Sequence, residues 1–186
     1  DAIPLIEHAK YLQPNPALER AYRAKARALG RFDLLLSISE SSRREAIDHL
    51  GMAPGRVVNI SAAADACFTP EPVPEAAAAA LRQRLGIHRP FVLCSGASDA
   101  RKNHFRLLSA FARLEPPVRA GHQLVMVGEV PGSHRRQVER HMRDCGLRDG
   151  EVVWTGRLSD EDLRSLYVLC TLFVFPSWHE GFGLPA

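Results

Sequence analysis

Four short apolar runs in the second half of the chain constrain its fold most strongly. They lie at residues 91–94, 124–127, 152–154 and 172–175. Each run is apolar throughout rather than alternating with polar residues, which is typical of strands in a parallel sheet with both faces covered. The segments between the runs carry apolar residues at helical spacing, for example at 107–114. We therefore predict an α/β fold in which Rossmann-like parallel sheets have helices on both faces.

The first half of the chain contains a smaller version of the same pattern. Residues 15–16, Asn-Pro, predict the start of a helix that ends at Gly30. Two further apolar runs, at 34–38 and 57–60, predict strands. Between them, residues 42–45 match the capping-box pattern that opens a helix. The first half therefore predicts a β-α-β unit.

The join between the two halves is marked by composition. Pro70, Pro72 and Pro74 alternate with other residues, and an alanine run follows at 76–80. Closely spaced prolines favour an extended linker, and alanines favour a helix. We predict a linker followed by a helix.

Composition excludes some classes of function. The chain has 186 residues, of which 46% are hydrophobic, which is enough for a packed core. With 24 Lys and Arg against 21 Asp and Glu, the net charge of +3 does not require a nucleic-acid partner. The cysteines form no Cys-x-x-Cys pair, so we predict free thiols in a reducing, cytoplasmic compartment. No signal peptide and no apolar stretch of membrane-spanning length is found in the sequence.

The loops that follow the four runs carry the residues that could bind a ligand or take part in a reaction. In parallel sheets, ligands bind at the carboxyl ends of the strands. The residues found there are Gly96 with Arg101 and Lys102, then Gly128, then Leu158, and finally Glu180 with Gly181 and Gly183. Arg101 and Lys102 opposite the glycines of a helix start would form a clamp for a diphosphate. The alternatives are that the two cations are a solvated surface pair and that the glycines only shape a tight turn.

Two further patterns could suggest a metal. Asp160 and Asp162 form an Asp-x-Asp pair, but they directly follow Ser159 at a predicted helix start, where acids favour the helix dipole. His104 and His179 have no companions at metal-ligand spacing. We favour capping for the acids and a loop or packing role for the histidines, and we expect no metal and no other cofactor.

The order of these loops resembles a known family. The segments at 96–103, 154–163 and 176–185, the last containing Glu-Gly-Phe-Gly-Leu-Pro, are similar to the retaining glycosyltransferases of family four, the glycosyl transferases group 1. Residues 1–5 and 37–42 are similar to the closing segments of the N-terminal domain in that family. The resemblance covers nearly the whole chain and implies the GT-B fold, in which the donor binds mainly to the second of two Rossmann-like domains.

The resemblance implies a role for each site residue. Lys102, with Arg101, would bind the donor diphosphate and neutralise charge on the leaving group. Glu180 would accept hydrogen bonds from the donor sugar. The remaining donor-binding residues would act through backbone amides or by flanking the base, and they are Gly96, Gly128, Leu158, Gly181, Phe182, Gly183 and Leu184. The family transfers the sugar with retention, and no protein nucleophile is implied.

The resemblance also implies a domain plan. Residues 1–68 would end the acceptor-side domain, 69–90 would be linker and helix, and 91–186 would begin the donor-binding domain, so that the chain is a fragment incomplete at both ends. The family's second glutamate would fall eight positions after Glu180, beyond Ala186. We expect the fragment alone to have little activity. Ala97 stands where many members of the family have arginine.

The function implied is transfer of a hexose, with mannose favoured weakly, from a GDP- or UDP-linked donor to a glycan or lipid-linked acceptor. Action in the cytoplasm, with peripheral contact to the inner face of the membrane, would suit such an acceptor. Two alternatives stay open: a nucleotide-sugar epimerase of the same fold, and a non-catalytic nucleotide-binding or interaction module. A dehydrogenase is disfavoured because no Gly-x-Gly-x-x-Gly fingerprint follows any predicted strand.

Overall fold

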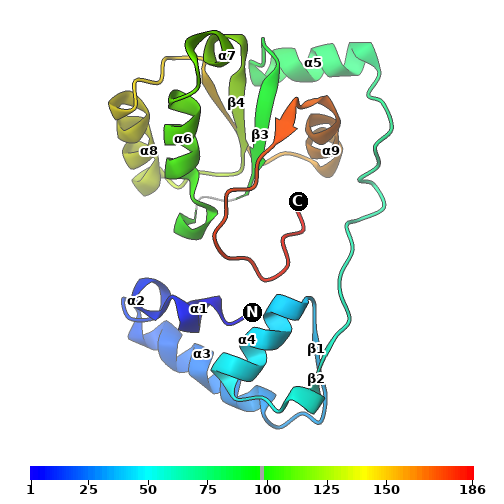
Figure 1. Cartoon of the computed structure of the whole chain (residues 1–186), viewed down its shortest axis with the longest axis vertical. Helices are drawn as coiled ribbons and strands as arrows, with labels where there is room; N and C mark the ends of the chain where they lie inside the picture. Colours follow the sequence, from blue (N-terminus) through cyan, green and yellow to red (C-terminus); the bar gives the residue numbers. More distant parts are fainter. Residues whose placement is uncertain (97–98) are drawn as a thin grey trace. The chain divides into compact units, whose positions relative to one another are not determined.

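The computed structural model describes residues 1–96 and 99–186 (Figure 1). Contacts between Cα atoms divide the chain into two compact units. Unit 1 contains Asp1–Ala64 and His179–Leu184, and unit 2 contains Asp65–Trp178 and Pro185–Ala186. The domain plan implied by the family resemblance stays a prediction.

Unit 2 is built on a parallel sheet. Its strands are β3 (Phe91–Ser95), β4 (Gln123–Val127), β5 (Val152–Gly156) and β6 (Leu172–Phe173). They lie in the order β5-β4-β3-β6, and each neighbouring pair is parallel. Both central strands are almost completely buried. The predicted parallel sheet is confirmed.

Helices cover both faces of this sheet, as predicted (Figure 1). On one face, α6 (His104–Ala112) and α8 (Gly132–Asp144) pack around a core that includes Cys94 and Leu108. On the other face, α5 (Glu75–Leu85) and α9 (Asp160–Leu169) pack around Leu93 and Leu166. Successive residues of β3 thus enter opposite cores, because side chains alternate across a strand. This explains why the strand is apolar throughout.

Two features of unit 2 differ from the predictions. The last strand, predicted as buried over 172–175, is β6 over two residues only, and Leu172 is 55% exposed. The reason is that β6 pairs with β3 alone, at the edge of the sheet. Leu114, predicted on the same helix as Phe111, lies beyond the end of α6, and the short helix α7 (Pro116–Gly121) follows.

A buried amide fixes the edge of this sheet where the strands begin. The Gln123 side chain is 1% exposed. Its Oε1 accepts hydrogen bonds from the backbone N–H groups of His88 and Arg89, at 2.7 and 3.0 Å. Its Nε2 donates to the carbonyl oxygens of Gly86 and Gly150, at 3.2 and 2.8 Å. One side chain therefore joins the segments that lead into β3 and β5.

Unit 1 contains the predicted β-α-β unit. The strands β1 (Leu35–Ser37) and β2 (Val57–Asn59) are parallel, and α4 (Glu40–Leu50) connects them with the short 3-10 helix η1 (Pro54–Arg56). Before β1 lie α3 (Pro16–Leu29) and two short helices that the sequence did not predict, α1 (Ile3–Ile6) and α2 (His8–Tyr11).

The starts of the helices in unit 1 test two sequence signals. Asn15 caps α3 as predicted, because its Oδ1 accepts a hydrogen bond of 3.1 Å from the N–H of Leu18. The start predicted at Ser42 is wrong, since α4 begins at Glu40. The Ser39 hydroxyl accepts the N–H of Ser42 at 2.9 Å and so caps the helix three residues earlier.

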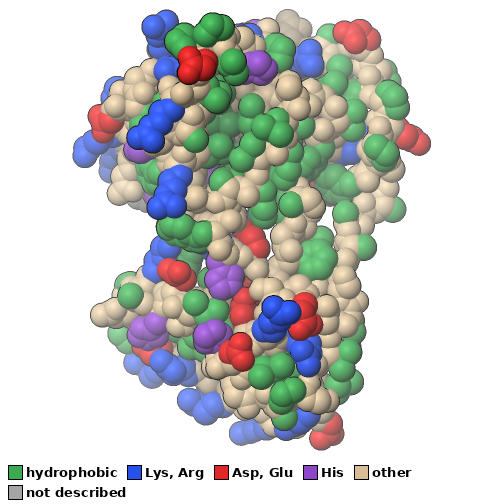
Figure 2. Space-filling view, in the orientation of Figure 1, with side chains coloured by type: hydrophobic (Ala, Val, Ile, Leu, Met, Phe, Trp, Pro, Cys, Tyr) green, Lys and Arg blue, Asp and Glu red, His purple; other side chains and the backbone are tan. Residues whose placement is uncertain are grey.

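The arginines of α8 lie on a solvated surface. Arg135, Arg136, Arg140 and Arg143 are all exposed. Figure 2 shows lysine and arginine side chains over this side of unit 2, mixed with other surface types. This confirms that the arginine cluster is a solvated helix face, which carries no argument for nucleic-acid binding.

Candidate functional site

The carboxyl ends of the central strands in unit 2 meet at one edge. Gly96, Gly128 and Gly156 follow or end β3, β4 and β5, and all three have positive φ, at 134°, 132° and 70°. The N–H of Gly96 donates to Val127 at 3.0 Å, and the N–H of Gly128 donates to Gly156, also at 3.0 Å. L side chains rarely adopt such φ values, so glycine permits these close crossings of backbone. The edge therefore presents backbone rather than bulky side chains.

Lys102 lies directly over the first of these glycines. A Cβ atom added at Gly96 would be 3.5 Å from both Cδ and Cε of Lys102 and 3.8 Å from its Nζ. The Nζ atom also lies 4.8 Å from the centroid of the Phe175 ring, within the range of a cation–π contact. Phe175 belongs to the loop that follows β6. The ammonium group is thereby held at the carboxyl edge, as the sequence predicts.

Arg101 has a different environment from Lys102. Both belong to the 3-10 helix η2 (Ala100–Lys102), and Asp99 caps this helix by accepting the Arg101 N–H at 2.8 Å. The same carboxylate oxygen is 3.6 Å from Nε of Arg101. Asp99 therefore offsets part of the positive charge of Arg101.

The loop after β6 is fastened to η2. Nδ2 of Asn103 donates to the Pro176 carbonyl at 3.1 Å, and the N–H of Trp178 donates to the Arg101 carbonyl at 3.2 Å. The guanidinium of Arg106 lies 5.8 Å from the centroid of the Trp178 ring. Since β6 and β3 are neighbours in the sheet, the loops that follow them meet at the same edge. Residues 175–178 and 101–102 therefore form one local cluster.

Two titratable side chains pack beneath this cluster. His104 is 5% exposed, and its ring centroid is 5.9 Å from that of Trp154. Burial, followed by the charges of Lys102 and His134, lowers the pKa of His104 to about 4. Burial raises the pKa of the Cys94 thiol to about 12, although Lys102 opposes this. Both groups are thus neutral near neutral pH. His104 is a packing residue, as predicted.

The second half of the motif belongs to unit 1. Residues His179–Leu184 group with unit 1 through their contacts. The carbonyl of Gly181 accepts hydrogen bonds from the hydroxyls of Ser39 and Ser42, the latter at 2.9 Å. The clamp predicted between Lys102 and the Gly181–Gly183 turn joins residues of different units, so it stays a prediction.

The predicted helix start after Glu180 is wrong. Residues 179–186 contain no helix in the structure. The Gly181 carbonyl is already bonded to serine hydroxyls, and Gly183 has a left-handed φ of 91°, which ends any helical turn.

Three predicted donor-binding side chains are apolar. Phe182 is 37% exposed and Leu184 is 53% exposed. Leu158 is partly buried and packs against the core on the α9 face of the sheet. Their predicted roles at the donor stay predictions.

The acidic pair at residues 160–162 lies in the first turn of α9, which Ser159 caps. Ser159 Oγ accepts the N–H of Asp162 at 3.2 Å, and Asp162 accepts a hydrogen bond of 2.7 Å from Arg84. This confirms the predicted cap at Ser159 and the place of the acids in the first turn of the helix. Within 1–96 and 99–186, no group of three or more His, Cys, Asp or Glu side chains is arranged to hold a metal ion.

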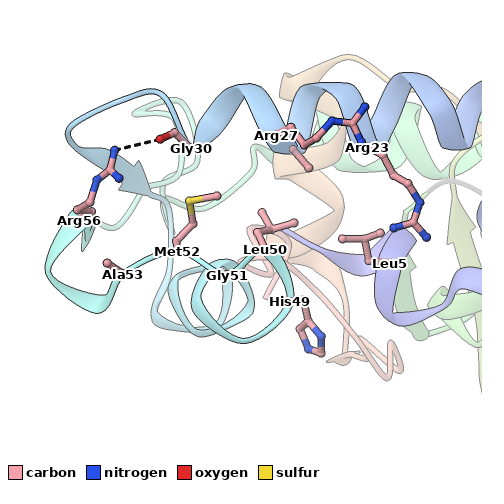
Figure 3. A pocket seen from close by; sticks show the side chains of 11 residues that line it. Leu5, Arg23, Arg27, Gly30, His49, Leu50, Gly51, Met52, Ala53 and Arg56 are labelled. Carbon is pink, nitrogen blue, oxygen red and sulfur yellow. Dashed lines mark hydrogen bonds between the residues drawn. The ribbon is translucent and has the colours of Figure 1, made fainter.

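A pocket of about 590 Å³ lies within unit 1, between α3 and the end of α4 (Figure 3). Its rim carries cationic side chains, including Arg23 and Arg56. Arg23 is paired with Glu19 at 2.8 Å, and Arg56 donates to the backbone carbonyls of Gly30, Phe32 and Asp33. Both cationic side chains are therefore already bonded to other groups of the protein.

No helix in the described part of the chain is long and apolar enough to cross a membrane.

Comparison with known proteins identifies the family. The model of the family described as glycosyl transferases group 1 matches residues 78–186, which include the whole carboxyl edge of unit 2. The chain belongs to this family. It is 33% identical over its full length to the serotype-specific mannosyltransferase WbdA of Escherichia coli, and it spans 23% of that protein. It is also 30% identical to the O-antigen chain mannosyltransferase B of Escherichia coli, over 82% of this chain and 39% of the relative.

Solved structures agree with the family assignment. Anabaena Alr3699/HepE, in complex with UDP and glucose, matches 92% of this chain and 46% of its own with a TM-score of 0.72 and 20% identity. Similarity at this level of identity establishes the fold, which is the α/β fold of GT-B type predicted from the sequence. The chain spans about a quarter of the length of WbdA and less than half of HepE.

Proposed function

We propose that this chain is part of a hexosyltransferase that transfers mannose from a nucleotide diphosphate donor to a glycan or lipid-linked acceptor. The observation that carries the proposal is the 33% identity to a mannosyltransferase over the whole chain. A second named mannosyltransferase, at 30% identity over 82% of the chain, supports the same sugar. The nucleotide is most simply GDP or UDP, and HepE gives a precedent for UDP on this fold.

The chemistry follows from the residues at the carboxyl edge. As the bond between the anomeric carbon and the diphosphate breaks, negative charge grows on the leaving oxygen, and Lys102 supplies a fixed positive charge to stabilise it. Arg101 assists with a charge that Asp99 partly offsets. Glu180 accepts hydrogen bonds from sugar hydroxyls. The acceptor oxygen bonds to the anomeric carbon and its proton passes to the diphosphate, with retention and without a protein nucleophile.

The proposal also covers the metal requirement and the cellular location of the enzyme. We expect no metal, because the Lys102 ammonium and backbone N–H groups can stabilise part of the negative charge on the diphosphate. The enzyme acts in the cytoplasm, and it contacts the inner face of the membrane peripherally when its acceptor is attached to a lipid.

The proposal is tested with the full-length protein and a panel of GDP-, UDP- and ADP-sugars. We expect transfer from one mannosyl donor, and NMR of the product should show the anomeric configuration of the donor. Lys102→Ala and Glu180→Ala should each lower kcat by about 100-fold or more, the range seen when a transition-state charge stabiliser is removed. Arg136→Ala, on the exposed face of α8, is the matched control and should be neutral.

The same panel separates the alternatives. An epimerase would change the sugar when the donor is incubated alone, without an acceptor. A non-catalytic module would bind nucleotide by calorimetry but give neither transfer nor hydrolysis. Absence of GDP, UDP and ADP binding to the full-length protein would refute the proposal.

A further inference from the structure

A buried carboxylate in unit 1 contacts the residue next to Glu180. Glu45 lies on α4 and is 6% exposed. Its Oε1 is 2.7 Å from Nε2 of His179, and its Oε2 accepts the N–H of Ala2 at 2.6 Å. Burial opposes ionisation, but the hydrogen bonds from His179 and Ala2 outweigh it, so the pKa of Glu45 is lowered. Glu45 is therefore a charged group that depends on these partners.

The same helix holds the residue on the other side of Glu180. The Gly181 carbonyl accepts hydrogen bonds from the hydroxyls of Ser39 and Ser42, and Ser42 is 6% exposed. The space around Gly181 is also filled, since a Cβ atom there would lie 2.7 Å from a carboxylate oxygen of Asp1. Residue 181 thus has little freedom to shift.

Both sequence neighbours of Glu180 are therefore held by contacts within unit 1. Residues 179 and 181 are both bonded to side chains of the first turns of α4, and the spacing 39, 42 and 45 places those side chains on successive turns of one helix face. Fixing both neighbours restricts the backbone of Glu180 to a narrow set of orientations. A carboxylate that must meet sugar hydroxyls gains from this, because a displacement of about 1 Å can cost 100-fold in rate.

We propose that Glu45 is a positioning residue that holds Glu180 through His179, so that α4 of unit 1 controls how the donor sugar is held. This inference rests on the proposed function, in which Glu180 binds the sugar. Glu45 itself contacts neither donor nor acceptor. Its effect should therefore appear in handling of the sugar and not in binding of the nucleotide, which depends on the unit 2 residues around Lys102.

The test compares Glu45→Gln with Glu40→Gln in the full-length protein. Both glutamates lie on α4, but Glu40 is exposed and makes only surface pairs with Arg43 and Arg44. We expect Glu45→Gln to lower kcat/KM for the nucleotide sugar about 10- to 100-fold. This range is typical for a residue that orients a functional side chain without contacting the substrate. Glu40→Gln should be neutral. Binding of the free nucleoside diphosphate, measured by calorimetry, should be unchanged in both variants.

A second measurement separates positioning from a structural role. In a Glu180→Ala background, adding Glu45→Gln should cause no further loss of transfer, because its effect passes through Glu180. If Glu45→Gln fails to fold, His179→Phe keeps a ring but removes the hydrogen bond to Glu45 from its more exposed end, where the side chain is 22% exposed. Full additivity of the two losses, or equal weakening of nucleotide binding, would overturn the inference.

The outcomes also distinguish the inference from the function on which it rests. A wild-type protein that transfers no sugar from any donor would refute the proposed function. An active wild type, with Glu45→Gln and His179→Phe both matching Glu40→Gln, would leave the function standing and refute the positioning role.

Discussion

His104 should make the stability of unit 2 sensitive to acid, by an amount that follows from its burial. Burial, then the charges of Lys102 and His134, lowers its pKa from 6.5 to about 4. The unfolded chain therefore takes up this proton at higher pH than the folded chain. Stability from the neutral ring is complete above pH 6.5 and is lost as the pH falls toward 4. A pKa difference of about 2.5 corresponds to about 3 kcal/mol.

That amount is a large fraction of the roughly 5–15 kcal/mol that stabilises a typical domain. The test compares the wild type with His104→Phe, which keeps a ring against Trp154 and does not titrate. Between about pH 7 and about pH 4.5, urea unfolding should show the wild type losing about 2 kcal/mol more than the variant. Because both proteins share the same carboxylates, the difference isolates His104.

The ring can also be observed directly. NMR of the His104 imidazole should show a midpoint near pH 4. A midpoint near 6.5, or parallel loss of stability in the two proteins, would refute the reasoning.

Three further predictions follow from features of unit 2. Gly96→Ala should cost about 1–3 kcal/mol in urea unfolding because its φ is 134°, whereas Gly121→Ala, which has open space and no positive φ, should not; equal costs would contradict the strain argument. Glu151→Gln should lower the unfolding free energy by about 2 kcal/mol by weakening its paired hydrogen bonds with Arg119, and no change in urea midpoint would exclude this. EDTA should leave transfer by the full-length protein unchanged in a radiolabelled-sugar assay, and restoration by added Mg²⁺ or Mn²⁺ would disprove independence from metal.

The sequence predicts the architecture of unit 2 well because local and global signals agree there. A strand that is apolar throughout, such as β3, is stable when it is buried between two layers of helices. The glycines after the strands indicate the carboxyl edge of the sheet. The cap of α9 was also predictable, because it is formed by Ser159 and Asp162, which are three residues apart. Arg101 and Lys102 look alike in the sequence, and only the structure shows that Arg101 lies 3.6 Å from Asp99 and that Lys102 lies against Gly96 and the Phe175 ring.

The errors have two physical origins. The start of α4 is set by a local cap, Ser39 on Ser42, which the sequence offers beside the pattern at Ser42. The conformation after Glu180 depends instead on hydrogen bonds from Ser39 and Ser42 to the Gly181 carbonyl, about 140 residues away in the sequence. No local pattern reports such a contact. Glu45 was missed for the same reason, since an isolated glutamate on a helix resembles any solvated residue until its partner His179 is known.

The four hydrogen bonds of the Gln123 amide all stabilise one end of the sheet in unit 2. They lie where the strands begin, at the opposite end from Gly96 and Lys102. Substitutions of Gln123 should therefore lower the melting temperature by freeing the segments that lead into β3 and β5, at a distance from the carboxyl edge where Lys102 lies.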